Sequence, residues 1–264
     1  MKALLISAFF VACRHVCVPV CLVLLGCPLP VAADPCRPDH VDEHVVITDV
    51  IDGDTVRLGD GRHVRLIGIN APERAHDGQA AEPLADEARQ ALLALVSGAR
   101  RIGLRYDVER RDRYGRTLAQ LFIDDRRNIQ ASLVADGYAA VIAVPPNLYG
   151  QACLHQQERQ ARRTQRGRWR LPAYRPVDIG GLTPDRHGFM LIRGRVDKIS
   201  RTEKSLWLNL GDRLSLRIAV QDQHYFNVND VNRLSGKVIT VRGWLYSYRN
   251  RLRMRLRHPD NLLW

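Results

Sequence analysis

The chain has 264 residues, which is enough for one large domain or two small ones. Hydrophobic residues make up 45% of it, so the composition excludes a disordered polymer and allows a packed core. The 40 Lys and Arg outnumber the 28 Asp and Glu, and the formal charge of +12 favours a polyanionic partner. Nucleic acid, an anionic membrane surface and an acidic polysaccharide all fit this charge.

The first 33 residues predict a signal peptide. Lys2 precedes two apolar runs, and residues 31–33, Val-Ala-Ala, fit a small-residue cleavage site. An exported protein, periplasmic or secreted, is therefore expected, and cleavage would remove two basic residues to leave +12 − 2 = +10. Two alternatives stay open. The run "LLGC" ending at Cys27 is similar to a lipoprotein signal, and the segment could instead remain as an uncleaved anchor.

Two cysteines, Cys36 and Cys153, lie beyond the predicted signal peptide. An even pair in an exported protein is a candidate for a disulfide, and the alternative is two unrelated thiols. The sequence holds no Cys/His cluster with the spacing of a zinc site after the signal peptide.

Periodicity divides the rest of the chain into two domains with mainly β structure and some α. The segments are an N-terminal arm, 34–43, a first domain, 44–172, a linker, 173–187, and a C-terminal domain, 188–264. In the first domain, alternating apolar residues predict strands and helical spacing predicts helices. The expected strands are 44–58, 62–69, 101–109 and 117–125, with a Gly-Asp-Gly turn at 59–61. The expected helices are 81–97, 128–136 and 150–168.

The C-terminal domain has a different pattern. Five short apolar-alternating runs within 188–264 predict five strands, and a run of this kind indicates a small OB-type barrel. Its arginine-rich strands carry four aromatic residues, Trp207, Trp244, Tyr246 and Tyr248. Cations interleaved with aromatics are typical of a face that binds single-stranded nucleic acid. Alternatively, the aromatics belong to the core and the arginines face water. The two domains show no sequence repeat.

The first domain opens with a pair of carboxylates, Asp52 and Asp54, around Gly53. Residues two apart on a strand point to one side, so both carboxylates can converge if Gly53 forms a bulge. Two adjacent carboxylates repel, and a hard divalent cation such as Ca²⁺ or Mg²⁺ relieves that repulsion. The alternative is an Asp-Gly turn with both acids in water.

Further polar residues follow at the next predicted strand. Asn70 offers an amide oxygen and Ala71 a backbone carbonyl, both suitable for a cation. Glu73 can act as a general base on a bound water. Arg65 and, from "DRYGR", Arg116 can hold a phosphate and neutralise charge in a transition state. Taken singly, each arginine could also be an ordinary surface charge.

Four ordered motifs carry a family resemblance: "VIDGDTVRL", "VRLIGINAPE", "DRYGRTLAQLFI" and "ASLVADGYAAV". Over about residues 44–170 the chain resembles the staphylococcal nuclease (thermonuclease) family. The resemblance implies an OB-like barrel of five strands with three helices. It also implies a calcium-dependent nuclease that cuts phosphodiesters in DNA and RNA.

The resemblance assigns roles residue by residue. The implied catalytic residues are Glu73 as general base and Arg65 and Arg116 as phosphate ligands. The implied calcium ligands are Asp54, Asn70 and the carbonyl of Ala71, with Asp52 as a supporting acid. Tyr114, together with Arg113 beside it, is implied to contact the substrate.

Two departures from the family pattern stand out. Asn70 replaces an aspartate that ligates calcium, which lowers the expected affinity and leaves Mg²⁺ or another divalent ion open. The segment "AVIAVPPN", with Ala143 and Pro145, lacks the tyrosines that stack on nucleotides. Substrate affinity must then come from elsewhere, such as the second domain or the basic third helix, whose arginines are Arg159, Arg162, Arg163 and Arg166.

The leading hypothesis is an exported, divalent-cation-dependent endonuclease acting on DNA, RNA or both. One alternative is a catalytically impaired nucleic-acid-binding protein on the same fold, and another is a structural protein that uses the barrel as a scaffold. The sequence implies no stable protein partner. It implies a membrane only through a lipid on Cys27 or an uncleaved signal.

Overall fold

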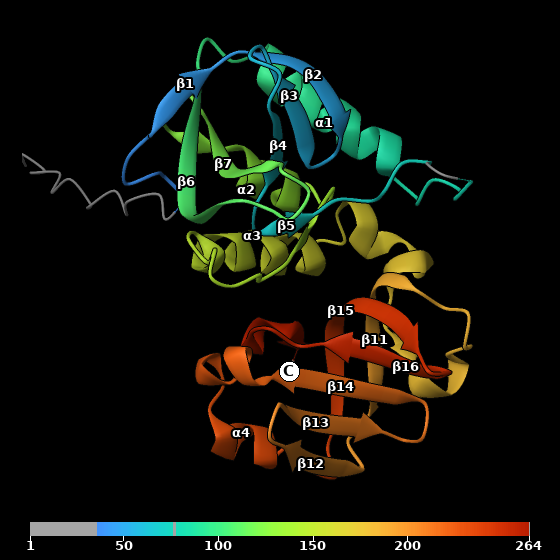
Figure 1. Cartoon of the computed structure of the whole chain (residues 1–264). Helices are drawn as coiled ribbons and strands as arrows, with labels where there is room; N and C mark the ends of the chain where they lie inside the picture. Colours follow the sequence, from blue (N-terminus) through green and yellow to red (C-terminus); the bar gives the residue numbers. More distant parts are fainter. Residues whose placement is uncertain (1–35, 76–77, 264) are drawn as a thin grey trace, which may run out of the picture. The chain divides into compact units, whose positions relative to one another are not determined.

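The computed structural model describes residues 36–75 and 78–263. They form two large β sheets and a set of helices, labelled in Figure 1. The predicted signal peptide, with Cys27, lies outside the described residues. Within the described ranges, every helix is too short or too polar to cross a membrane.

The first sheet is built from seven strands, counted over the described residues, in the order β1-β6-β7-β4-β3-β2 with β8 beside β7. All neighbours are antiparallel except β4 and β7, which run parallel. The strands are β1 (Glu43–Val45), β2 (Ile47–Asp52), β3 (Thr55–Leu58), β4 (His63–Leu66), β6 (Ile102–Arg111), β7 (Thr117–Ile123) and β8 (Arg127–Asn128). A short separate pair joins β5 (Ile69–Asn70) to β9 (Ala140–Val141).

The prediction of one strand over 44–58 is wrong. The chain turns back at Gly53-Asp54, so that β2 and β3 form a hairpin in which Asp52 pairs with Thr55. The Asp-Gly-Asp segment is thus a turn and not a bulge, because two residues are enough to reverse an antiparallel strand. The strand predicted over 62–69 is also interrupted. Gly68 adopts φ +83°, which separates β4 from β5.

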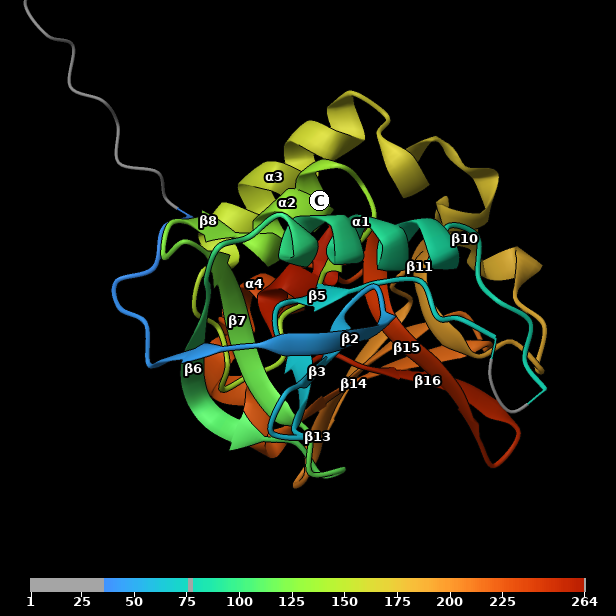
Figure 2. The ribbon, with the colours of Figure 1, turned by 90° about the horizontal axis from the view of Figure 1, so that it is seen from above.

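Three helices accompany the first sheet, as the sequence predicts. They are α1 (Ala85–Ser97), α2 (Ile129–Ala135) and α3 (Gln151–Arg163). The first helix begins four residues later than the predicted 81, because Leu84 has a left-handed backbone and ends the preceding turn. Helix α1 runs beside β2 (Figure 2). Asn128 caps α2 by accepting the N–H of Ala131.

Beyond α3 the chain forms short 3₁₀ turns, η1 (Gly167–Arg170) and η2 (Pro172–Tyr174). The third helix therefore ends at Arg163 and not at the predicted 168. Cys153 of α3 forms a disulfide with Cys36 of the N-terminal arm, the pairing expected from the sequence.

The second sheet has the order β10-β11-β15-β16-β14-β13-β12, with β17 beside β15. Its strands are β10 (Val177–Asp178), β11 (Gly188–Arg195), β12 (Lys198–Thr202), β13 (Ser205–Leu210), β14 (Leu214–Ala219), β15 (Val238–Tyr248), β16 (Arg251–Arg255) and β17 (Leu262–Leu263). The helical turns are η3 (Ile179–Gly181), η4 (Val220–Tyr225), α4 (Val228–Asn232) and η5 (Pro259–Asn261). The expected alternation at 251–256 is confirmed, since Leu252, Met254 and Leu256 are buried.

Two boundaries differ from the prediction for this region. The first strand expected in this domain, residues 189–200, is divided into β11 and β12, which pair with different neighbours, β15 and β13. Part of the segment expected as a linker, 173–187, belongs to the second sheet. Val177 and Asp178 pair in parallel with β11, and Leu182 is buried in the second hydrophobic core. Apolar residues within a Pro/Gly-rich segment are the reason, because they gain free energy by leaving water.

The two sheets have the same pairing order. Position by position, β1, β6, β7, β4, β3 and β2 correspond to β11, β15, β16, β14, β13 and β12. Among these corresponding strands the parallel contact falls at the equivalent place, β4 with β7 and β14 with β16, while the additional strand β10 pairs in parallel with β11 at the edge of the second sheet. In both, helical structure follows the third strand of the hairpin series. Five-stranded Greek-key barrels of the OB type have this connectivity, so the OB-like fold class is confirmed and occurs twice.

A buried ion pair links the two barrels. Arg242 of β15 donates to both carboxylate oxygens of Glu158 on α3, each at 2.8 Å, and to the carbonyl of Val141. The side chains of Arg242 and Glu158 are 3% and 4% exposed. Nearby, His155 of α3 contacts Asp260 of η5 at 2.7 Å. Helix α3 thus contributes two side chains to the contact between the barrels (Figure 1), and Arg257 of the second barrel adds a hydrogen bond to the carbonyl of Pro145 at 2.6 Å.

Candidate active site

The Asp-Gly-Asp turn is pressed against the loop that follows β5. A side-chain carbon at Gly53 would lie 2.6 Å from Cβ of Ala71 and 2.7 Å from Cβ of Ala88 on α1. Such distances are well inside van der Waals contact, so only glycine lets the turn approach this closely. The close approach places Asp54 beside the Ala71 backbone.

Asp54 is the buried anchor of the site. Its side chain is 2% exposed. One oxygen, Oδ2, accepts the N–H of Ala71 at 2.7 Å, and the other, Oδ1, accepts the hydroxyl of Thr55 at 3.2 Å. The same Oδ1 forms an ion pair with Arg65. Asp52 supports the turn by accepting the N–H of Asp54 at 2.9 Å.

Arg65 projects from β4 into this group of oxygens. Besides Asp54, it donates to Oδ1 of Asn70 at 3.2 Å and to the carbonyl of Ile69. Burial lowers the pKa of Arg65 to about 10, with the Asp52 carboxylate opposing this effect and the Arg116 guanidinium adding to it. Arg65 therefore remains a cation at neutral pH.

Burial also acts on Asp52. It raises the pKa of this carboxyl, although the charges of Arg65 and Arg116 and hydrogen bonds at Thr55 lower it in part. The effects that these groups have on one another show that they form one electrostatic cluster.

The loop after β5 presents the remaining predicted residues. Asn70 is buried, and its amide nitrogen donates to the carbonyl of Ala71 at 3.3 Å. Glu73 is exposed, and its main chain is held by two hydrogen bonds with Glu82. The Glu73 carboxylate raises the pKa of Arg65, which places it within electrostatic range of that guanidinium.

Arg116 is positioned by its own turn. Asp112 accepts its Nε at 2.7 Å and its backbone N–H at 2.9 Å. Burial raises the pKa of Asp112, but the hydrogen bonds and charge of Arg116 outweigh it, so the net shift is downward. Arg113 donates to the hydroxyl of Tyr114 on the same turn, and Tyr114 is 69% exposed.

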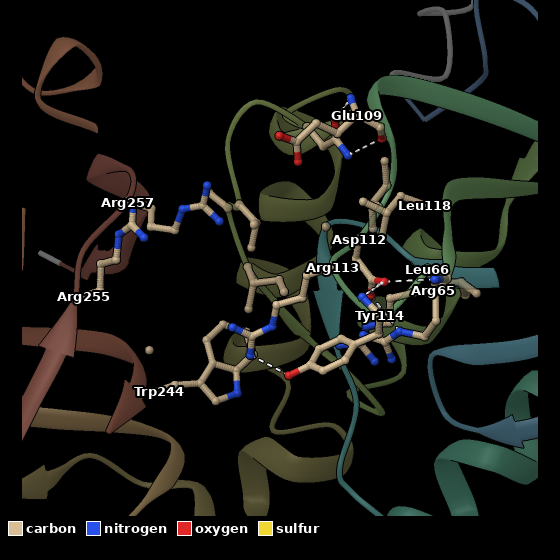
Figure 3. A pocket seen from close by; sticks show the side chains of 18 of the residues that line it. Arg65, Leu66, Glu109, Asp112, Arg113, Tyr114, Leu118, Trp244, Arg255 and Arg257 are labelled. Atoms are coloured by element: carbon tan, nitrogen blue, oxygen red, sulfur yellow. Dashed lines mark hydrogen bonds and ion pairs between the residues drawn. The ribbon is translucent and has the colours of Figure 1, made fainter. Parts of the chain in front are cut away.

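Arg65 and Arg116 line a cleft of about 880 Å³. Both barrels contribute to it, and Figure 3 shows Trp244 of β15 and Tyr114 on opposite sides with Arg113 between them. The lining includes six arginines and two carboxylates. The arginines are Arg65, Arg111, Arg113, Arg116, Arg255 and Arg257, and the carboxylates are Glu109 and Asp112. This excess of positive charge suits a polyanion.

The predicted set is thus partly assembled. Arg65, Arg116, Arg113 and Tyr114 share the cleft, whereas Glu73 is not among its lining residues. The group of Asp54, Asn70 and Ala71 does not line the cleft, but Asp54 and Asn70 contact Arg65, which does. The arginines of the third helix do not line the cleft, and Arg162 instead packs over the Trp169 ring at 4.2 Å and beside Glu158.

Two residues that position the site were not found from the sequence. Arg168 is almost fully buried and donates to the carbonyl of Asn70 at 3.2 Å, with its guanidinium 4.0 Å from the Tyr174 ring. Glu158 accepts the N–H of Val141, whose strand β9 pairs with β5. A buried charge whose partner lies far along the chain leaves no local pattern, and the segment around Arg168 is polar and rich in arginine, so no signal in the sequence indicates it.

The oxygen atoms around Asp54 fit a hard divalent cation in type. They comprise carboxylates of Asp52 and Asp54, the amide oxygen of Asn70 and the carbonyl of Ala71. Among the described residues no group of three or more His, Cys, Asp or Glu side chains is arranged to hold a metal. Arg65 at present donates to two of these oxygens.

Comparison with known proteins places the first barrel in a family of nucleases. The family model described as Staphylococcal nuclease homologue matches residues 63–171. A thermonuclease of Staphylococcus intermedius is 31% identical over 130 residues, which cover 48% of this chain and 76% of that protein. A thermonuclease of Staphylococcus hyicus is 29% identical over 123 residues, covering 46% and 72%. A probable endonuclease, lcl3, of Pyrenophora tritici-repentis is 30% identical over 119 residues, covering 43% of each.

The fold and the cleft define an OB-barrel protein with a cleft lined by arginines. The chain belongs to the staphylococcal nuclease family of enzymes. The family-model match ends at residue 171, so the second barrel lies beyond it.

Proposed function

We propose that this protein is an endonuclease that hydrolyses phosphodiester bonds of nucleic acid with the help of a divalent cation. The observation that carries the proposal is the joint placement of Arg65 and Arg116 in one cleft beside the buried Asp54 group. Two guanidiniums in a partly enclosed cleft can bind one phosphate by paired hydrogen bonds. The relatives named thermonuclease and probable endonuclease support the same reaction class.

In the proposed reaction, Glu73 accepts a proton from water, and the water oxygen forms a new bond to phosphorus. The bond from phosphorus to the leaving oxygen breaks, that oxygen takes up a proton from solvent water, and Glu73 returns the proton that it accepted to solvent. Arg65 and Arg116 hold the nonbridging oxygens, where negative charge grows in the transition state. Donors fixed in advance by Asp54 and Asp112 need little reorganisation, which is the main source of such catalysis.

Asp54, Asn70 and the carbonyl of Ala71, with Asp52 nearby, would hold the cation. A bound Ca²⁺ or Mg²⁺ supplies charge neutralisation and orientation of a phosphate oxygen. With Asn70 in place of a third carboxylate, the site holds less negative charge, and we expect weak affinity for Ca²⁺.

The proposal is tested by incubating the purified protein with plasmid DNA and with RNA, in Ca²⁺, in Mg²⁺ and in chelator. We expect cleavage that requires a cation and falls about 10²- to 10⁴-fold in Glu73→Gln, the usual contribution of a general base. Glu87→Gln, an exposed acid on α1, serves as the matched control and should cleave normally. Binding without cleavage in every metal would favour the alternative, a nucleic-acid-binding protein that has lost catalysis.

The metal assignment has its own test in Asn70→Asp. The substitution adds a carboxylate and removes the amide that donates to Ala71, which frees the carbonyl for a cation. We expect roughly tenfold tighter Ca²⁺ binding by calorimetry, since charge count among the ligands sets affinity. Unchanged or weaker Ca²⁺ binding would count against this set of ligands.

We also propose that the protein works outside the reducing cytosol, in the periplasm or as a secreted protein. The disulfide between Cys36 and Cys153 supports this location, because such bonds persist in oxidising compartments. Mass measurement of the native protein without reductant should give a value two hydrogens below that of the dithiol form. Free thiols at both cysteines would contradict the proposal.

A further inference from the structure

We infer that the second barrel carries a track for single-stranded nucleic acid that continues the cleft of the nuclease site. The track is defined here as Trp244, Tyr246 and Tyr248 on β15 with Arg251, Arg253 and Arg255 on β16. The inference rests on the nuclease function proposed above, and it names the substrate form and the surface that grips it.

The three aromatic residues form an exposed row. Trp244, Tyr246 and Tyr248 are 45%, 38% and 46% exposed, whereas Leu245 between them is buried. Alternate residues of a strand share one face, so all three rings stand on the same side of β15. The exposed parts of these rings gain nothing from contact with water, and every nucleic-acid base offers a flat surface to stack on them.

Arginines lie directly beside this row. Arg253 pairs in register with Tyr246, and Arg251 pairs with Tyr248. The Arg253 guanidinium sits 4.4 Å from the Tyr248 ring, and its Nε is buried with no hydrogen-bond acceptor among the described residues. The Arg253 guanidinium beside the Tyr248 ring supplies a contact for the phosphate that accompanies a stacked base, whereas Arg255 is already paired with Asp222.

The track and the nuclease site are continuous. Trp244, Tyr246 and Arg255 line the same cleft as Arg65 and Arg116. Figure 3 shows Trp244 facing Tyr114 across the cleft, with Arg255 and Arg257 further along the same wall. The wall of the first barrel is aliphatic at Ile142, Ala143 and Val144. The opposite wall therefore supplies aromatic surface that this segment lacks.

The spacing of the row favours a single strand. Alternate residues on a strand are about 6.7 Å apart, twice the roughly 3.4 Å between stacked nucleotides of a duplex. Bases seated on successive rings would be separated from each other, and a paired and stacked duplex does not allow that. Unpaired bases of a single strand can be splayed onto aromatic side chains.

The test compares full-length protein and its variants on three substrates: a dinucleotide, a single strand longer than the roughly 4–16 nucleotides that one OB barrel binds, and the matching duplex. In Tyr246→Ala and Trp244→Ala we expect the KM for the long single strand to rise roughly 5- to 150-fold, the loss of one stacked base. The increase should be much smaller for the dinucleotide. Trp244→Phe should restore most of the affinity.

Val238→Ala is the matched control, because Val238 is 48% exposed on the same strand but lies away from the track. Its kinetics should equal those of the unaltered protein. Because Trp244 also packs on Phe189, thermal unfolding of each variant accompanies the assay, and Tyr246→Ala alone is decisive if Trp244→Ala is unstable. Equal KM values for the long single strand before and after Tyr246→Ala would overturn the inference.

Equilibrium binding separates this inference from the proposed function. The Glu73→Gln protein is titrated into fluorescent single strand in chelator, where no cleavage takes place. We expect tighter binding of the single strand than of the duplex, a preference that Tyr246→Ala abolishes. Arg253→Gln should reduce the dependence of log affinity on log salt by about 0.7.

A protein that binds the strand through these residues but never cleaves it would refute the nuclease function and leave the track supported. Equal affinity for both substrates would refute the track.

Discussion

In the first barrel the turn between β2 and β3 ends in Asp54, whereas the matching turn between β12 and β13 of the second barrel ends in Lys204. The sheet registers define the correspondence, since Thr55 pairs with Arg65 and Ser205 pairs with Ala219. Thus the second barrel has a lysine and an alanine at the places where the first has its buried carboxylate and its arginine. At this turn the first barrel carries a charge cluster, whereas the second barrel has ion pairs elsewhere, between the buried Asp222 and the arginines Arg255 and Arg257.

The outer faces differ in the opposite sense. The second barrel exposes three aromatic rings on β15, while the corresponding strand of the first barrel, β6, exposes charged residues and Val108 at its far end. The comparison teaches that barrel geometry provides positions and that side chains at a few of them decide the role. Under the proposed function, the first barrel would hold the reactive cluster and the second barrel would offer the stacking surface.

The largest expected effect is a loss of stability when the ion pair between Arg242 and Glu158, which joins the two barrels, is broken. Arg242→Met should lower the free energy of unfolding by about 3–5 kcal/mol, because Glu158 would remain buried without its main partner. Urea denaturation measures the change. The double variant Arg242→Met/Glu158→Leu should recover most of the loss. Arg233→Met, which breaks the exposed pair with Asp230, is the control at about 0–1 kcal/mol. A loss below 1 kcal/mol for Arg242→Met would show that the barrels do not depend on this pair.

The second effect concerns the cluster that the second barrel lacks. Arg65→Lys should reduce kcat about 10²- to 10³-fold, because a lysine cannot bind a phosphate oxygen pair with a planar fork. Single-turnover cleavage of an oligonucleotide measures it. Arg57→Lys on the same hairpin, exposed beside Asp49, should leave the rate unchanged. Full activity in Arg65→Lys would show that the arginine at this position, where the second barrel has Ala219, does not contribute to catalysis through its planar guanidinium.

A smaller effect tests the close approach of the hairpin turn. Gly53→Ala should cost about 1–3 kcal/mol of stability, because the added carbon overlaps Ala71 and Ala88. Gly59→Ala is the control, since its added carbon meets no atom closer than 3.7 Å. Thermal unfolding of both variants is compared. Equal stability would mean that the turn can move away from Ala71 without penalty.

The smallest effect is on the response to acid. Burial opposes ionisation of Glu158, but Arg242 and Arg162 lower its pKa below the ordinary 4.5. Hydrogen bonds from His155 and His258 likewise outweigh burial and lower the pKa of Asp260. Groups with a lowered folded pKa stabilise the protein above their unfolded pKa, and that stability is lost as pH falls through the folded value.

The free energy of unfolding should therefore decrease below about pH 4.5, by at most about 1.4 kcal/mol per pH unit for each group. Glu158→Gln should make the slope shallower, whereas Asp230→Asn on the exposed surface should not. Urea denaturation at several pH values gives the slopes. Parallel curves for Glu158→Gln and the unaltered protein would exclude a role for this carboxylate.

Much of this organisation was predictable from the sequence. The alternation of apolar residues located most strands and the three helices, and four ordered motifs indicated the family. For Asp52–Asp54 the sequence allowed either a bulged strand with converging carboxylates or a turn with both acids in water. The structure combines parts of both, because the segment is a turn and the Asp54 carboxylate is buried in a cluster with Arg65. A two-residue turn and a bulged strand share the same local letters, so only the pairing of Asp52 with Thr55 distinguishes them.

Other features depended on contacts between distant residues. The shared pairing order of the barrels has no sequence repeat behind it, because only the apolar pattern must be kept for one connectivity. Nothing in the local sequence distinguishes Arg242 from the other arginines of the C-terminal domain. Its burial against Glu158, 84 positions away, has no local signature. The aromatic row on β15 was visible in the sequence, but its place on the wall of the cleft was not.

Arg242 donates hydrogen bonds to the carboxylate of Glu158 and to the carbonyl of Val141, and these bonds have a practical consequence for protein engineering. The region that matches the family model ends at 171 and would be the natural piece to excise. Taken alone, that piece would present a carboxylate without its guanidinium at the strand next to β5, which carries Asn70. Transferring this barrel into another protein would therefore require substitutions at positions 155 and 158 of α3, whose side chains contact the second barrel. The unit that can be exchanged is larger than the unit that the sequence outlines.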